Sequence, residues 1–167
     1  MSVKITDSGS TDIKRMIAGL KIIEDSEVLV GLIGNEDTEL MIYAGAQEFG
    51  ASIKRGKTTV ILPERSWLRE TLDQVKVQDR IFEEYERGIR DFFSGSIAAE
   101  QVMHRVGLVA VAEIRNRIVN NDPAFTPLAD STLAKKKGPG IMRESLRLFK
   151  AINYSINGKV YDVQVAA

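Results

Sequence analysis

The chain has 167 residues, which is the size of one ordinary domain with a sizeable hydrophobic core. Lys plus Arg and Asp plus Glu both number 23, so the net charge is zero. General nucleic-acid binders gain affinity by neutralising phosphates, so a neutral chain is a poor candidate for that class. The chain has no cysteine, one histidine and no apolar run near the ~20 residues of a membrane span, which excludes disulfides, thiolate chemistry, His-rich zinc sites and spanning helices.

The N-terminal third predicts a helix, a strand and a second helix. Residues from about 11 to 24 place apolar side chains at helical spacing: Ile13, Met16, Ile17, Leu20 and Ile23. Val28–Ile33 is a short apolar run typical of a strand, and a helix follows from Asp37 or Thr38 to Phe49, where Gly50 ends it. Whether the first helix packs on its own core or on a neighbouring molecule stays open. The N-terminus lacks the apolar core of a signal peptide, so we expect a cytoplasm-like setting.

The middle of the chain predicts a basic loop followed by a strand and two long helices. Residues 52–57 carry three cations around Gly56 and are expected to form a flexible, exposed loop. Thr58–Leu62 is rich in β-formers and is ended by Pro63. Ser66 is expected to cap a helix that extends as far as Phe93, within which Gly88 is a local weak point, and another helix is expected over 97–119.

The C-terminal part predicts a loop over 127–137, with one helical turn opened by Asp130 or Ser131, and then a β-hairpin. Asn157-Gly158 is a type I′ turn signal between two alternating runs, so Ile156 should face Lys159 and Tyr154 should face Tyr161. The opposite face, formed by Asn153, Ser155, Asp162 and Gln164, suits water or a partner. The fold class expected for residues 1–167 is a single α+β domain: a small antiparallel or mixed sheet of about four strands, with this C-terminal β-hairpin, packed against two or three helices.

Three stretches resemble the phage neck and tail-completion proteins of long-tailed phages and prophages, also called minor tail or virion morphogenesis proteins. Tyr43–Gly50 (YAGAQEFG) is similar to that family's helix ending in Glu-Phe-Gly. Leu62–Arg69 (LPERSWLR) is similar to its Ile-Pro-x-Arg-x-Phe-Leu-Arg turn, and Asn121–Gly138 to its Pro-Leu-Ser-x-x-Thr-x-x-x-Lys segment. The order of the stretches, with the hairpin after them, carries the resemblance from about Val28 to Val165.

The resemblance implies a structural virion protein of the head–tail junction and no enzymatic activity. Such a protein forms or joins a ring, expected to be a hexamer, with neighbouring neck and tail tube proteins as partners and possible non-specific contact with DNA in the channel. It is expected in the virion, and in the host cytoplasm during assembly, with no cofactor, metal or membrane. The subtype stays open between adaptor, stopper, tail terminator and completion factor. The alternative function is a DNA-binding or metal-dependent phage-encoded accessory enzyme, for which no motif with the required ligand spacing is found.

The candidate contact residues are all basic. They are expected to touch a neighbouring subunit, a partner or the DNA channel, and they are Lys54, Arg55, Lys57, Arg65, Arg69, Lys135, Lys136 and Lys137. A plainer reading gives Arg65 and Arg69 local ion pairs with Glu64, Glu70 or Asp73, and leaves the lysines solvated. Glu48-Phe49-Gly50 is read either as an interface patch or, more plainly, as a helix end with Phe49 in the core. Trp67 is read as a core anchor beneath the turn, with an interface contact as the alternative. Glu83-Glu84 is read as part of a charged outer helix face, and His104 as a surface or satisfied histidine.

Overall fold

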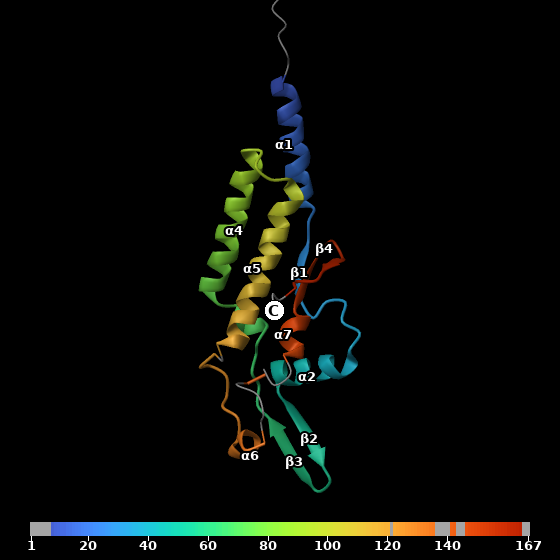
Figure 1. The fold of residues 1–167 in the computed structure, drawn as a ribbon, viewed down its shortest axis with the longest axis vertical. Coiled ribbons are helices and arrows are strands. Elements are labelled where there is room, and N and C mark those ends of the chain that lie inside the picture. Colours follow the sequence, from blue (N-terminus) through green and yellow to red (C-terminus); the bar gives the residue numbers. More distant parts are fainter. Residues whose placement is uncertain (1–7, 121, 136–140, 143–145, 165–167) are drawn as a thin grey trace, which may run out of the picture.

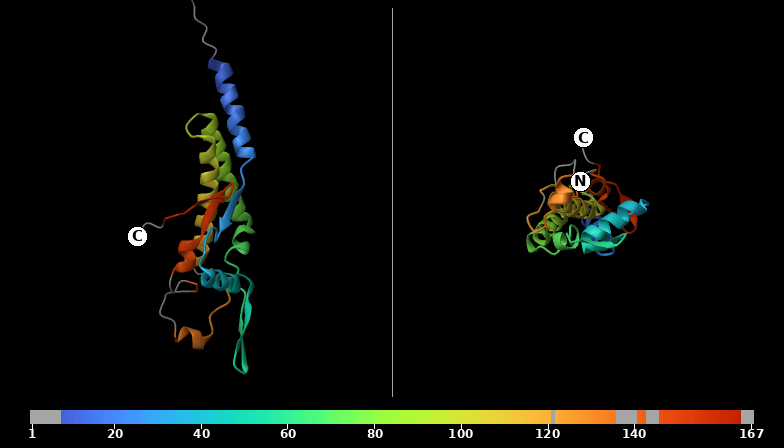
Figure 2. Two further views of the ribbon diagram at one scale, coloured as in Figure 1. Left: turned by 90° about the vertical axis from the view of Figure 1, so that its right-hand side faces the viewer. Right: turned by 90° about the horizontal axis from the view of Figure 1, so that it is seen from below.

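The computed structural model describes residues 8–120, 122–135, 141–142 and 146–164, and it confirms the α+β class. The molecule is long and narrow, with a helix projecting at one end and a two-stranded ribbon at the other (Figures 1 and 2). The five strands in the described part form two antiparallel sheets rather than one. The prediction of about four strands is therefore close to the five described. The prediction of a single sheet is wrong, because the strands divide between a three-stranded and a two-stranded sheet.

Two long antiparallel helices form the body: α4 (Val75–Phe93) and α5 (Ala99–Val119). They pack closely at Gly88, where an added Cβ would lie 2.9 Å from Cγ1 of Val102. The glycine therefore allows the two helices to approach, although it weakens α4 locally. Glu84, read as part of the outer face, is instead buried between these helices and pairs with Arg87 and Arg105.

A three-stranded sheet lies against α5 in the order β1-β4-β5: β1 (Val28–Gly31), β4 (Asn153–Ile156) and β5 (Lys159–Tyr161). The C-terminal hairpin has the predicted register, with Tyr154 opposite Tyr161 and their rings stacked at 5.4 Å. Asn157 and Gly158 have the positive φ angles, 50° and 79°, of a type I′ turn. Gly107 of α5 lies directly against the ring of Tyr154, so the helix covers this face of the sheet closely.

Ser155 was expected to face water or a partner, but it is buried in β4, the central strand between β1 and β5. His104 is a satisfied histidine: its Nδ1 lies 2.9 Å from the hydroxyl of Tyr154, and its ring meets that of Tyr161 edge-on.

The main core gathers around the C-terminal half of α5. Its buried members come from α5, from the turn after Pro63, from α7 (Arg147–Ala151) and the residue after it, and from the sheet. They include Trp67, Val111, Ile114, Ile118, Leu148, Ile152 and Tyr154. A smaller cluster joins Ile23, Phe92, Ala99 and Val102 at the other end of the body. The anchor role predicted for Trp67 is confirmed, since it is 2% exposed.

The first helix, α1 (Ser8–Glu24), begins three residues before its predicted start and packs only by its last turns. Gly19 lies against the ring of Phe92, and Ile23 is buried in the smaller cluster. The stripe residues Ile13 and Ile17 are exposed to 59% and 62%. The first turns of α1 therefore reach beyond the α4–α5 pair (Figure 1).

The expected flexible loop over 52–57 is wrong. Ala51–Arg55 forms strand β2, which pairs with β3 (Thr58–Leu62) through the two-residue turn Gly56-Lys57. Gly56 supplies the positive φ of 60° that such a tight turn requires. The exposure expected for this segment is confirmed, because Lys54 and Lys57 are exposed and the ribbon projects from the body (Figure 2).

The expected helix from Ser66 to Phe93 is interrupted. A short helix, α3 (Arg69–Leu72), ends at Asp73, and α4 starts at Val75 after Gln74 adopts an extended conformation. Two further helices follow the prediction: α2 spans Thr38–Phe49 with Asp37 accepting from the N–H of Leu40, and α6 spans Asp130–Leu133. The short helix α7 was not predicted.

Candidate functional site

The carboxylate of Glu48 joins the end of α2 to the turn that follows β3. Glu48 is 4% exposed, although it lies next to the exposed Phe49. It accepts a hydrogen bond from the Ser66 hydroxyl at 2.6 Å and from the backbone N–H groups of Trp67, Leu68 and Arg69 at 2.8, 2.9 and 3.0 Å. These N–H groups open the short helix α3 and have no partner inside it. One buried side chain therefore accepts from three of these N–H groups, while Ser66, the expected cap, accepts from the N–H of Glu70.

Opposing effects act on the ionisation of Glu48. Burial raises the pKa of its carboxyl, but the hydrogen bonds from Ser66, Leu68, Arg69 and Trp67 together lower it further than burial raises it. The net pKa lies below the ordinary value of 4.5, so the charged form is the native form at neutral pH. The Ser66 hydroxyl makes two hydrogen bonds: it donates to Glu48 and accepts from the N–H of Glu70.

Arg65 makes a second link, from the turn to the segment before α6. It is only 3% exposed and donates from Nε to the carbonyl of Thr126 at 2.6 Å and from Nη2 to that of Pro127 at 3.2 Å. Its backbone N–H and one Nη1 group meet the carbonyl and side chain of Gln47. The predicted ion pair of Arg65 is therefore wrong, because a buried guanidinium is satisfied here by carbonyls.

The two links and Trp67 form one structural unit, which we call the junction: Gln47, Glu48, Arg65, Ser66, Trp67, Thr126 and Pro127. Trp67 adds a hydrogen bond from Nε1 to the carbonyl of Ala44 at 3.2 Å. The three stretches that carry the family resemblance thus meet at one place. Their buried polar groups bind one another, so the junction has a structural role and presents no nucleophile with a free base.

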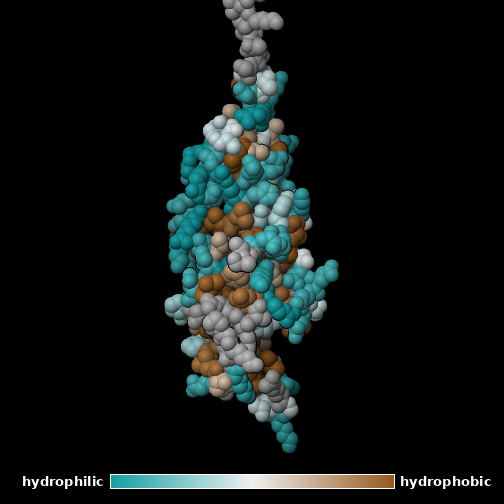
Figure 3. Space-filling model, viewed as in Figure 1, coloured by the Kyte–Doolittle hydropathy of each residue, from teal (hydrophilic) through white to brown (hydrophobic). Residues whose placement is uncertain are grey.

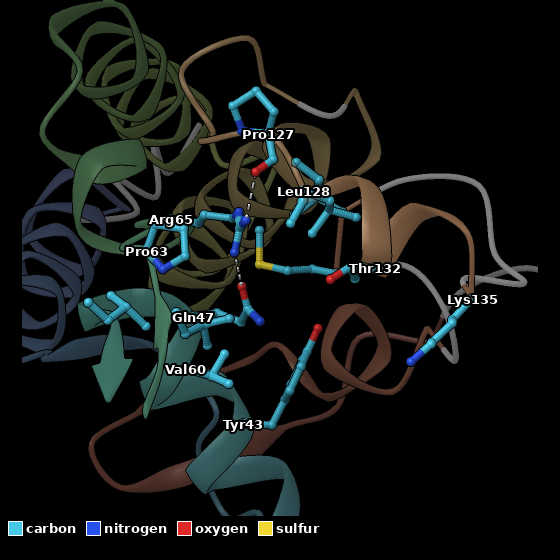
Figure 4. A pocket seen from close by; sticks show the side chains of 14 residues that line it. Tyr43, Gln47, Val60, Pro63, Arg65, Pro127, Leu128, Thr132 and Lys135 are labelled. Atoms are coloured by element: carbon cyan, nitrogen blue, oxygen red, sulfur yellow. Dashed lines mark hydrogen bonds between the residues drawn. The ribbon is translucent and has the colours of Figure 1, made fainter. Parts of the chain in front are cut away.

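An open groove with a volume of about 740 Å³ lies beside the junction (Figure 4). It runs between α2, β3 and the segment around α6, and Arg65 lies at its inner wall. Most of its lining is apolar: Val60, Ile61, Leu62, Pro63, Pro127, Leu128, Ala129, Ile141 and Met142. Tyr43, Thr132 and Lys135 add polar groups, so the groove suits an apolar side-chain stripe better than a small charged molecule.

The predicted contact residues fall into separate groups. Lys54 and Lys57 are exposed on the projecting ribbon, where Arg55 pairs with Thr58 across the turn. Lys135 is exposed at the edge of the groove, whereas Lys136 and Lys137 lie outside the described residues. The structure does not bring the ribbon cations and Arg65 together, since Arg65 is buried inside the body.

Arg69 has the predicted surface ion pair. Its Nη2 lies 2.6 Å from Glu64 Oε1, its Nε lies 3.3 Å from Glu48 Oε1, and its guanidinium sits 4.9 Å from the centre of the Phe49 ring. Phe49 was expected in the core, but it is 65% exposed. The cation above the ring explains how an aromatic side chain is held at the surface here.

The groove and the anchoring role of Glu48 are absent from the sequence prediction. The only local signal for Glu48 is its place in the Glu-Phe-Gly motif, which marks a helix end and does not indicate that the side chain binds the turn at Ser66 and Trp67. The groove has no such local signal, because its walls come from segments up to about a hundred residues apart.

Comparison with known proteins adds no assignment: no family model, no curated protein and no solved structure matches this chain. Within the part of the chain that the structure describes, no group of three or more His, Cys, Asp and Glu side chains is placed to hold a metal ion. Among the same residues, no helix has both the length and the apolar character needed to cross a membrane.

Proposed function

We propose that this chain is a structural protein of the phage head–tail junction, of the neck, tail-completion or tail-terminator type. It acts by forming or joining a ring, with six copies expected, that connects the tail to the head. Its partners are then further copies of itself and the neighbouring neck and tail tube proteins, and its site of action is the virion.

The observation that carries this proposal is the convergence of three separate stretches of family resemblance at the junction. Tyr43–Gly50, Leu62–Arg69 and the segment through Thr126 and Pro127 are joined by Glu48 and Arg65. A resemblance by chance would have no reason to place its three parts in contact. The junction fixes the base of the ribbon to the body. This rigidity suits a structural protein, which acts by holding its partners in a defined geometry.

The ribbon supports the proposal independently. A two-stranded sheet alone is marginally stable in water, and stability normally comes from a third strand or a covering helix. Ile53, Val60 and Ile61 are exposed to 46%, 44% and 75%, which is unusual for apolar strand residues. Contact with a neighbouring subunit or a tube protein would cover them. The cations Lys54, Arg55 and Lys57 at its tip then face either that neighbour or the DNA channel.

The test combines purified protein with tail tubes that lack their end proteins. We expect negative-stain images to show rings, or density added at one end of the tubes. Particles made without the gene should fail to join heads to tails, and supplying the gene should restore joining. A protein that binds no virion component and hydrolyses a substrate with added metal would overturn the proposal.

A further inference from the structure

The exposed side of α1 is an apolar stripe with helical spacing. Ile13, Ile17 and Leu20 follow at i, i+4 and i+7 and are exposed to 59%, 62% and 39%. The adjacent side of the helix is already used, because Gly19 and Ile23 contact the body. In proteins, most of the stability of a helix comes from burying an apolar face rather than from helix propensity. This spacing is the pattern by which amphipathic helices bind in apolar grooves.

The groove beside the junction has the complementary character. Its floor and walls include Leu62, Leu128, Ile141 and Met142, and the half-exposed Val60 lies at its margin. Figure 3 shows hydrophobic side chains on this lower part of the molecule, near the segment leading to α6 and the root of the ribbon. The volume of about 740 Å³ lies within the range of roughly 300–1,000 Å³ usual for binding sites.

We propose that the α1 stripe of one copy binds in the groove of a second copy. This deepens the proposed function, on which it rests, by naming the two surfaces that repeat around the ring. The stripe and the groove lie towards opposite ends of the long axis, so a single molecule cannot bring its own pair together (Figures 1 and 2). Each copy carries one of each, which is the arrangement of a head-to-tail contact that closes by rotation.

The size of the contact favours a second copy over a tightly bound foreign protein. The stripe offers a few partly exposed aliphatic side chains, less than the roughly 800 Å² per partner that a stable complex buries. Such a contact is weak when made once. It becomes stable when every copy makes it twice in a closed ring, because the contact that closes the ring is intramolecular and each copy is then held on two sides.

The natural chain has no cysteine, so introduced thiols report single contacts. One preparation carries Ile17→Cys and a second, with a tag of different size, carries Thr132→Cys at the groove. Equal amounts are mixed at roughly 0.5 mM, a concentration at which weak contacts are populated, and treated with a short thiol-reactive crosslinker. We expect a crosslinked heterodimer at a yield at least about tenfold above that of Ile17→Cys mixed with Leu108→Cys, an exposed control position on α5.

A second pair of variants guards against artefacts of folding. In this second experiment the groove chain again carries Thr132→Cys, and the α1 chain carries its reporter thiol as Ile13→Cys. Adding Ile17→Asp to the α1 chain should remove the crosslink. Adding Leu108→Asp to the α1 chain instead should leave the crosslink in place. Crosslinks that join two Ile17→Cys chains, or that are as strong with the control position, would overturn the inference. Normal docking on tail tubes without any α1–groove crosslink in the docked protein would overturn the inference and leave the proposed function intact. A crosslink between α1 and the groove in a protein that has no virion role would support the contact between copies and overturn the proposed function.

Discussion

At the scale of single residues, the charge of Glu48 matters because its hydrogen-bond partners are all donors. The carboxylate receives the Ser66 hydroxyl and three backbone N–H groups in a site that is 4% exposed. Glu48→Gln would place an amide N–H₂ group against some of these donors and leave them unpaired. We expect a loss of about 2–4 kcal/mol in the free energy of unfolding, measured by urea denaturation.

The matched control is Glu64→Gln, which makes the same change of charge in the turn that Glu48 binds. Glu64 is half exposed and pairs with Arg69 at the surface, so its substitution should cost less than about 1 kcal/mol. Equal losses for the two variants would show that charge in this region, rather than the buried geometry, accounts for the effect.

The same residue gives the protein an acid sensitivity of known sign. The pKa of Glu48 is lower in the folded protein than in the unfolded chain, because its hydrogen bonds outweigh its burial. The stability it contributes is therefore fully present above the unfolded pKa of about 4.5 and is lost as the pH falls through the folded value. Urea unfolding between pH 7 and pH 3 should show the wild type losing stability faster than Glu48→Gln below about pH 4.5.

A second carboxyl with a lowered pKa, Asp37, does not confuse this measurement. It caps α2 through the N–H of Leu40 and pairs with Arg147, and both proteins retain it. Parallel pH profiles for wild type and Glu48→Gln would contradict the role assigned to the Glu48 charge.

At the scale of elements, close helix packing should reverse the usual effect of replacing glycine in a helix. An added Cβ at Gly107 would lie 2.4 Å from Cδ2 of Tyr154, and at Gly88 it would lie 2.9 Å from Cγ1 of Val102. We expect Gly107→Ala to destabilise the protein by about 1–3 kcal/mol and Gly88→Ala by less, since a valine methyl shifts more easily than a hydrogen-bonded ring.

Gly45 in α2 is the control, because nothing lies within 4 Å of the position its Cβ would take. Gly45→Ala should stabilise the protein by up to about 1 kcal/mol through helix propensity alone. Thermal unfolding of the three variants, followed by circular dichroism, gives the comparison. Stabilisation by all three substitutions would refute the close-packing explanation.

The elements that the sequence predicts well are those whose signals are local. Asn157-Gly158 determines its own turn, and the alternating residues on either side set the register, so the hairpin is correct to the residue. Strand β2 is missed because its pattern of one isoleucine among serine, lysine and arginine looks like a loop, and only pairing with β3 reveals it. The end of α3 and the start of α4 are missed because the apolar pattern continues through Asp73 and Gln74.

The candidate site is less predictable than the fold for a related reason. The burial of Arg65 depends on carbonyls at Thr126 and Pro127, about sixty residues away, and no spacing rule connects them. The exposure of Phe49 depends on Arg69 lying above its ring. Hydropathy places arginine outside and phenylalanine inside, and here long-range hydrogen bonding and a cation–ring contact reverse both positions.

At the scale of the whole molecule, the ribbon tip separates contact with DNA from contact with protein. Replacing Lys54, Arg55 and Lys57 with glutamine removes three positive charges from the sequence of the ribbon and leaves that of the body unchanged. If the tip faces the DNA channel, particles should still join but should lose DNA more readily, and the defect should change with salt. The matched control replaces the exposed Lys76, Lys150 and Lys159. Normal joining and normal DNA retention in the ribbon variant would remove any role for these cations.

The head-to-tail contact proposed between α1 and the groove also predicts how a defective subunit behaves among normal ones. A subunit with Ile17→Asp retains a working groove but cannot supply a stripe, so it enters an assembly and blocks its continuation on one side. In a ring of several copies a single such subunit is enough to leave the ring open. Co-expression of the variant with wild type in equal amounts should therefore reduce the yield of joined particles well below half, as counted by plaque assay and electron microscopy. Leu108→Asp, which changes an exposed α5 residue by the same chemistry, should leave the yield unchanged. A yield that falls only in proportion to the fraction of variant would mean that subunits act independently, and the stripe would then have no place in a closed ring.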